Sequence, residues 1–149
     1  GGFGDGRGLA AALALGADGI NMGTRFVATQ EAPVHENVKQ RMVEASELDT
    51  SLIFRTLRNT ARVFKNSIAE KVVEIEALPG DTDFKDLQPL VAGVKGREVL
   101  DKGDLEYGIW TAGMVVGLIK DIPTCDDLIK TIMADAEEII SARLGGMVR

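Results

Sequence analysis

Cysteine is almost absent from this sequence, since Cys125 stands alone among 149 residues. A single cysteine excludes an intrachain disulfide, which agrees with a reducing compartment, and we expect a cytoplasmic protein. No uninterrupted apolar run approaches the roughly 20 residues needed to span a bilayer, so we expect no transmembrane segment. Acidic residues outnumber basic ones by 23 to 17, and the net charge of −6 argues against nucleic acid or an anionic membrane as a partner.

Histidine is as scarce as cysteine. His35 is the only one, and because no cysteine, serine or carboxylate constellation accompanies it, we interpret it as a structural residue beside a helix start. Cys125 falls in the first turn of a predicted helix, where the dipole lowers a thiol pKa, but Asp126 and Asp127 oppose that effect. We expect an inert thiol and assign no catalytic residue to this chain.

Glycine, in contrast, is abundant, and five of the 17 glycines fall within the first eight residues. They precede LAAALALG, a strong helix former, and Gly16 stands where a glycine would end that helix. Residues 17–22 then resemble a short buried strand, which ends in a second small turn at Gly23 and Thr24. Because bare amides before a helix attract phosphate, the sequence predicts two successive phosphate-binding turns.

The rest of the pattern is mostly helical. We expect a loop over residues 26–33, an extended segment over 51–57, and helices over 36–45, 61–77, 84–92 and 96–102. Residues 108–119, GIWTAGMVVGLI, should be buried. Thr124 and Asp127 resemble a capping box that begins a final helix, which ends at Gly145 and Gly146. Its apolar stripe comprises Leu128, Ile129, Ile132, Met133, Ala136, Ile139, Ile140 and Leu144.

These elements cannot form a self-contained parallel sheet, because every buried strand needs partners. We therefore predict an α/β fold in which residues 1–30 form the last helix-strand unit of a TIM (β/α)8 barrel and residues 31–149 form a mostly helical extension. In such barrels the loops after the last two strands often bind phosphate. Because the chain opens without Met, we expect the carboxy-terminal part of a longer protein.

A dinucleotide-binding fold is the main structural alternative. Residues 6–11, GRGLAA, fit the pattern G-x-G-x-x-A. However, no apolar strand precedes them, and the strand predicted after them ends in NMGT without an acid that could bind a ribose. This context argues against a Rossmann interpretation.

Four separated blocks resemble the nitronate monooxygenase (2-nitropropane dioxygenase-like) family of FMN-dependent TIM-barrel oxidoreductases. They are GGFGDGRGLAAALALGADGINMGTRF, EAPVHENVKQ, LRNTARVFKN and GIWTAGMVVGLIKDIPT, and together they cover nearly the whole chain. The blocks LRNTARV and GIWTAGM most resemble the bacterial branch that also holds NADH:quinone reductases. Enoyl-acyl-carrier-protein reductase II is a more distant relative that shares the opening motif.

This resemblance implies an FMN site in which backbone groups hold the phosphate, at Gly1 and Gly2 and at Met22, Gly23 and Thr24. It places the catalytic histidine upstream of this chain and implies no metal. The implied activity is oxidation of alkyl nitronates with oxygen. NADH:quinone reduction and an enoyl-acyl-carrier-protein reductase II-like activity stay open, as do a homo-oligomer and, from another class, a non-catalytic helical interaction domain.

Three further features carry weaker signals. Basic residues recur at three- and four-residue spacing from Arg55 to Lys65 and could meet a dinucleotide phosphate or an acidic partner, although a solvated helix face is the default interpretation. Gly113 and Gly117 could allow backbone to approach the flavin, or could allow close helix packing. Met114, between them, is a weak candidate for the site.

Overall fold

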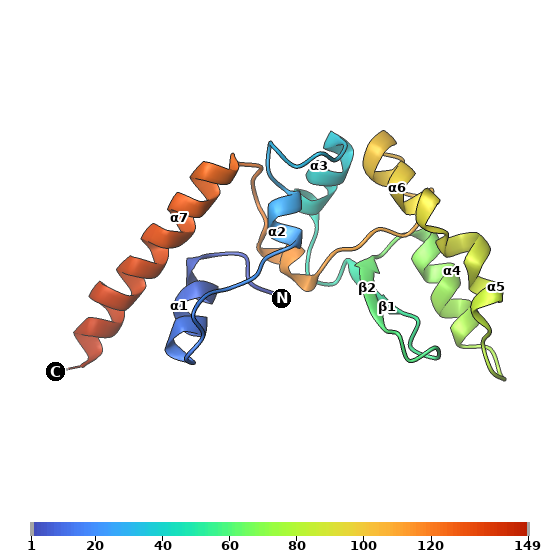
Figure 1. Cartoon of the computed structure of the whole chain (residues 1–149), viewed down its shortest axis with the longest axis horizontal. Coiled ribbons are helices and arrows are strands. Elements are labelled where there is room, and N and C mark those ends of the chain that lie inside the picture. Colours follow the sequence, from blue (N-terminus) through green and yellow to red (C-terminus); the bar gives the residue numbers. More distant parts are fainter. Residues whose placement is uncertain (1, 149) are drawn as a thin grey trace.

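The computed structural model describes residues 2–148, and its elements fall into three groups along the longest axis (Figure 1). Helices α1 and α7 lie at one end, α2 and α3 in the middle, and a β-hairpin with α4, α5 and α6 at the other end. The helices are α1 (Gly6–Ala14), α2 (Thr24–Val27), α3 (Glu36–Glu44), α4 (Ser67–Glu76), α5 (Phe84–Val91), α6 (Gly93–Lys102) and α7 (Cys125–Glu138). The hairpin comprises β1 (Thr50–Ile53) and β2 (Ala61–Phe64), and the shorter helical turns are η1 (Met114–Leu118), η2 (Ile139–Leu144) and η3 (Gly145–Met147).

Helices α1 and α7 pack with their backbones in close approach. A Cβ on Gly6 would lie 2.8 Å from both the backbone nitrogen of Ala136 and the backbone oxygen of Ile132. Glycine at this position therefore allows the two helices to touch. The core that they share contains Leu9, Ala10, Leu128, Ile132 and Ala136.

The strand predicted over residues 17–22 is not formed. The structure of residues 2–148 contains two strands, which pair with each other in the β1–β2 hairpin, so residues 17–22 have no strand to pair with. Ile20 and Met22 nevertheless pack partly against the α1–α7 core. The buried-strand prediction is wrong here because an extended segment becomes a strand only when a neighbour supplies hydrogen-bonding partners.

The central core surrounds α3, close to its predicted bounds. Val38, Met42 and Ala45 are buried as predicted. His35 begins the helix, since its Nδ1 accepts a hydrogen bond from Asn37 N–H at 3.1 Å. This contact gives His35 the structural role predicted for it. The loop predicted over residues 26–33 is only partly a loop, because α2 extends through residue 27.

The predicted helix over residues 61–77 divides into a strand and a helix. Residues 61–64 form β2, which pairs antiparallel with β1 so that Phe64 faces Thr50. The Phe64 ring also stacks on Trp110 with 4.3 Å between ring centroids. Helix α4 begins only after Asn66, whose side chain accepts the Ala69 N–H at 2.9 Å. The prediction is wrong for residues 61–64 because cross-strand pairing and aromatic stacking outweigh a helical spacing of apolar residues.

Helices α5 and α6 confirm the two helices predicted before residue 103, although α6 begins three residues early, at residue 93. Gly96 allows α6 to approach the following segment, since a Cβ there would lie 2.6 Å from the backbone oxygen of Ile109. Gly103 ends α6 with a left-handed φ of 74°. The second core, between the hairpin, α4 and α5, contains Ile53, Val63, Ala69, Val72, Leu87 and Val91.

The apolar segment over residues 108–119 is only partly buried. Trp110, Ala112, Val115, Val116 and Ile119 lie in the interior, while Met114 and Leu118 remain 51% and 50% exposed.

The apolar stripe of α7 is likewise buried on one edge only. Thr124 caps the helix as predicted, because its Oγ1 accepts the Asp127 N–H at 3.1 Å. Ile129 and Met133 remain exposed beside the buried Leu128 and Ile132. No helix within residues 2–148 is both long enough and apolar enough to cross a bilayer.

Candidate cofactor-binding site

The opening turn packs against η1. Gly1 lies outside the described residues. Gly2 is exposed and has a φ of +89°, a left-handed conformation that favours glycine. Two residues later, a Cβ on Gly4 would lie 2.6 Å from Cγ2 of Val115, so the backbone of the turn runs directly over this side chain.

The amide end of α1 is already occupied by a carboxylate. Asp5 accepts the Gly8 N–H at 3.0 Å and pairs with the Arg7 guanidinium at 2.6 Å. Partial burial alone would raise the pKa of Asp5, but these hydrogen bonds outweigh burial and lower the pKa below its ordinary value. A phosphate near this turn would therefore meet the amides of the glycine turn rather than the start of α1.

The second turn is fastened to the same region of the chain. Thr24 Oγ1 accepts the Gly113 N–H at 2.9 Å, which leaves the Thr24 hydroxyl hydrogen free to donate to another acceptor. Gly23 has a φ of −97°, and a Cβ on it would meet no atom within 4 Å. Neither backbone conformation nor packing among residues 2–148 requires glycine at position 23.

Residues 113–115 thus connect the two turns. Gly113 contacts Thr24 of the second turn, and Val115 contacts Gly4 of the first. The structure brings Gly4 and Thr24, which are twenty residues apart in the sequence, to the start of one 3-10 helix. Met114, whose neighbours make both contacts, has an exposed side chain.

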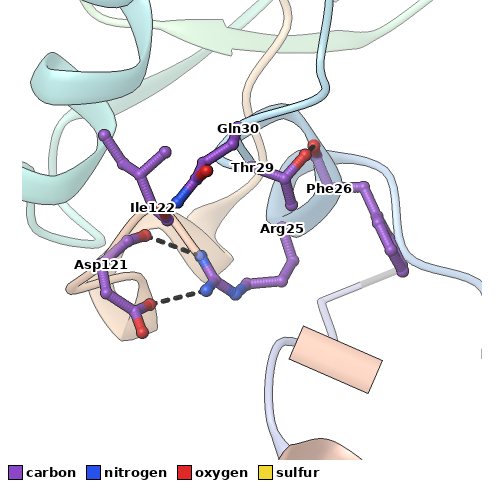
Figure 2. A network of polar contacts seen from close by, with 6 residues as sticks. All are labelled: Arg25, Phe26, Thr29, Gln30, Asp121 and Ile122. Atoms are coloured by element: carbon purple, nitrogen blue, oxygen red, sulfur yellow. Dashed lines mark hydrogen bonds and ion pairs between the residues drawn. The ribbon is translucent and has the colours of Figure 1, made fainter. Parts of the chain in front are cut away.

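An ion pair that the sequence analysis missed anchors α2 (Figure 2). Arg25 is only 4% exposed, and its guanidinium lies 2.6 Å from Asp121 Oδ1 and 3.2 Å from the Asp121 backbone oxygen. Gln30 adds a hydrogen bond from its side chain to Ile122 O at 3.4 Å. These contacts fix α2 and the residues after it, and this helix begins at Thr24, directly after Gly23. The available signal was an arginine within the otherwise apolar segment after the turn.

Cys125 has carboxylates on two sides. Its backbone N–H donates to Glu31 at 2.9 Å, and this hydrogen bond is the main cause that lowers the pKa of Glu31. Asp126 and Asp127 follow it in the first turn of α7. The thiol itself donates to Thr29 Oγ1 at 3.6 Å, and an inert thiol stays a prediction.

The remaining candidates do not form the arrangements that the sequence suggested. Arg55 and Arg58 lie in the turn between β1 and β2, and Arg62 lies on β2, so the predicted basic helix face is wrong. Gly113 and Gly117 do not form one helix-packing pair. A Cβ on Gly117 would lie 2.8 Å from the backbone nitrogen of Glu47, whereas Gly113 approaches Thr24.

Comparison with known proteins agrees with the resemblance on which the site was predicted. The model of the nitronate monooxygenase family matches residues 1–135. The chain belongs to this family. The family and its solved relatives imply a TIM-barrel fold, so the α/β prediction is confirmed at that level. The assignment of residues 1–30 to the last helix-strand unit of the barrel stays a prediction.

Three relatives represent the range of similarity. A (3aS,4S,5R,7aS)-5-hydroxy-7a-methyl-1-oxo-octahydro-1H-indene-4-carboxyl-CoA dehydrogenase of Rhodococcus jostii is 34% identical, over 95% of this chain and 50% of its own. A nitronate monooxygenase of Neurospora crassa is 29% identical, over 94% of this chain and 37% of its own. The structure of FabK from Thermotoga maritima superposes with a TM-score of 0.90 at 36% identity, over 99% of this chain and 46% of that chain. This chain therefore spans half or less of the length of these relatives.

Proposed function

We propose that the whole protein is an FMN-dependent oxidoreductase of the nitronate monooxygenase family and that this chain supplies its phosphate-binding region. The observations that carry the proposal are the contact of Gly4, two residues after the first turn, with Val115 and the hydrogen bond from Gly113 to Thr24 of the second turn. Two turns that are fastened to the same short segment can present their amides to one phosphate group. In this proposal residues 1–30 end the barrel and residues 31–149 form its helical extension.

The chain's own groups have defined roles in this proposal. Backbone amides of Gly1 and Gly2 and of Gly23 donate to phosphate oxygens, Met22 shapes the second turn, and Thr24 adds its hydroxyl hydrogen. The three amides and the hydroxyl are neutral donors to an anion, and such hydrogen bonds are stronger than those between two neutral groups. FMN, when bound, supplies the electron-transfer chemistry. The catalytic residue comes from outside this chain, and no metal is required.

For the substrate, the sequence prediction of an alkyl nitronate oxidised with oxygen is one candidate, and NADH with a quinone is its close alternative. The family model and the relatives named nitronate monooxygenase support the nitronate. A cytoplasmic location and a homo-oligomer stay predictions.

A thioester substrate is the second candidate, and the identities favour it among the matches that cover nearly the whole chain. Relatives named CoA dehydrogenases are 34% and 31% identical to this chain, whereas the nitronate monooxygenases of Neurospora crassa and Staphylococcus saprophyticus are 29% and 27% identical. The similarity to FabK supports the enoyl-acyl-carrier-protein reductase II-like alternative. Both comparisons point to a substrate held on a thioester carrier.

Anaerobic mixing of the whole protein with each reductant separates these candidates. Bleaching of the flavin absorbance by a nitronate alone supports the monooxygenase. Bleaching by NADH supports a reductase, and the oxidant that then restores the colour, a quinone or an enoyl thioester, identifies the second substrate. If the purified protein shows neither flavin absorbance nor FMN binding, the non-catalytic helical interaction domain replaces the proposal.

A further inference from the structure

The segment over residues 50–69 carries the highest local positive charge in an acidic chain. No acidic residue occurs between Asp49 and Glu70, although the chain as a whole has a net charge of −6. Lys65 lies 3.8 Å from Glu70, but within residues 2–148 the arginines of this segment form no ion pair with a carboxylate. The cationic residues of the segment are Arg55, Arg58, Arg62 and Lys65.

Two of these arginines lie in a hairpin turn whose backbone is fixed from α4. The Glu76 carboxylate accepts hydrogen bonds from Phe54 N–H at 2.9 Å, from Thr56 N–H at 3.0 Å and from the Thr56 hydroxyl at 2.7 Å. Arg58 N–H donates to Arg55 O at 3.2 Å and closes the turn. The negative charge of Glu76 is thus engaged by the turn itself, while both arginine side chains are exposed to solvent.

An open cavity of about 450 Å³ lies beside this turn. Leu52, Val73 and Ala77 give it apolar walls, and Arg55, Thr56 and Glu76, whose carboxylate is held by the hairpin turn, also line it. A cation next to apolar surface suits a phosphorylated organic group better than a small inorganic ion, because a hydrated inorganic ion makes no apolar contact with the walls.

We propose that Arg55 and Arg58 bind the phosphate groups at the nucleotide end of a coenzyme A thioester. This inference rests on the thioester substrate of the proposed function. The hairpin is joined to the candidate flavin site through one short segment, since Phe64 N–H donates to Trp110 O at 2.9 Å and Gly113 donates to Thr24. The turn itself points away from α2 (Figure 1). A carrier whose phosphates and thioester are separated by a long flexible arm fits this separation, because contacts with the remote part of a substrate can position its reacting group.

Binding of coenzyme A and of pantetheine, which lacks the phosphates, tests this assignment in the whole protein by calorimetric titration. The test variant combines Arg55→Gln with Arg58→Asn. Asparagine tolerates the left-handed φ of 54° at position 58, so the variant removes charge without opposing the backbone. The matched control combines Arg97→Gln with Arg143→Gln, which removes the same charge from positions elsewhere in the chain.

We expect the test variant to bind coenzyme A about 100-fold more weakly than the wild type, roughly tenfold for each charge-assisted hydrogen bond that the variant can no longer make. Pantetheine binding should be unchanged, and the control should match the wild type. Equal coenzyme A affinity in wild type and test variant overturns the inference, as does a wild type that binds pantetheine as tightly as coenzyme A.

The same samples distinguish this inference from the proposed function. If purified acyl carrier protein binds the wild type and not the test variant, while coenzyme A binds neither, the turn is a protein-docking surface and the coenzyme A assignment is wrong. Flavin absorbance and its bleaching by NADH report on the proposed oxidoreductase separately. Phosphate recognition by the two arginines is supported or refuted by the coenzyme A titration alone.

Discussion

The ion pair between Arg25 and Asp121 gives an asymmetric prediction, because one partner is buried and the other is not. Arg25 is 5% exposed in its side chain and Asp121 is 71% exposed. Among residues 2–148, Asp121→Ala leaves the buried guanidinium with the backbone oxygen at 3.2 Å as its one hydrogen-bond partner. Arg25→Met instead removes the buried charge, keeps most of the packing of the side-chain stem, and leaves a carboxylate that water can solvate.

The magnitudes follow from this asymmetry. Removing one partner of a fully buried pair costs about 3–5 kcal/mol, and solvent at Asp121 should reduce the cost of Asp121→Ala to about 2 kcal/mol. Arg25→Met should cost about 1 kcal/mol, since a hydrophobic replacement of a buried charge is often tolerated. The double variant should then resemble Arg25→Met alone, which corresponds to a coupling of about 2 kcal/mol between the two positions.

Urea unfolding of the whole protein and its two single variants and double variant measures these values. FMN affinity, measured on the same four proteins, should fall in Asp121→Ala, because α2 directly follows the turn that we propose for the phosphate. If Asp121→Ala lowers the free energy of unfolding no more than Arg25→Met does, the ion pair does not stabilise the fold and its anchoring role is refuted.

Three further predictions concern single positions. Gly6→Ala should destabilise the protein by about 2 kcal/mol, because the clash of the new Cβ with backbone atoms of α7 at 2.8 Å costs more than the gain in helix propensity. Gly19→Ala is the control in thermal unfolding and should be nearly neutral, because a Cβ there meets no atom within 4 Å. Asp49 accepts hydrogen bonds from Ser46 N–H and Oγ, and these lower its pKa, so the stability that the carboxylate contributes is present above its unfolded pKa and is lost as pH falls through its folded pKa. The difference in Tm between wild type and Asp49→Asn should therefore shrink from pH 7 to pH 3, and a difference independent of pH contradicts this reasoning. Gly23→Ala should leave thermal stability nearly unchanged but weaken FMN binding at least about tenfold, since a Cβ there meets no atom of residues 2–148 within 4 Å and would crowd the phosphate. Unchanged FMN affinity counts against the second turn.

Capping and amphipathic patterns predicted the helices well, because both signals are local. Thr124 caps α7 where its spacing to Asp127 indicated, and α3 buries the apolar face that its spacing indicated. The helix predicted from residue 61 was wrong because Phe64 satisfies a helical spacing by coincidence, while its actual partners, Thr50 and Trp110, are distant in the sequence. Asn66, a good N-cap residue, was the local signal for the true helix start.

Residues that depend on distant contacts were harder to predict at the candidate site. The motif placed the two glycine turns, but it gave no indication that Gly113 and Val115 would contact both of them. Arg25 was missed because its partner, Asp121, is 96 residues away. The α1 start was expected to be open to phosphate, although Asp5 already fills it, as an aspartate directly before a helix should have indicated.

The comparison of FMN with riboflavin tests the central claim most directly, because the two molecules differ only in the phosphate. Flavin-free whole protein should bind FMN at least about 100-fold more tightly than riboflavin, which corresponds to two or more charge-assisted hydrogen bonds. Equal affinity for FMN and riboflavin would show that the glycine turns do not hold the phosphate.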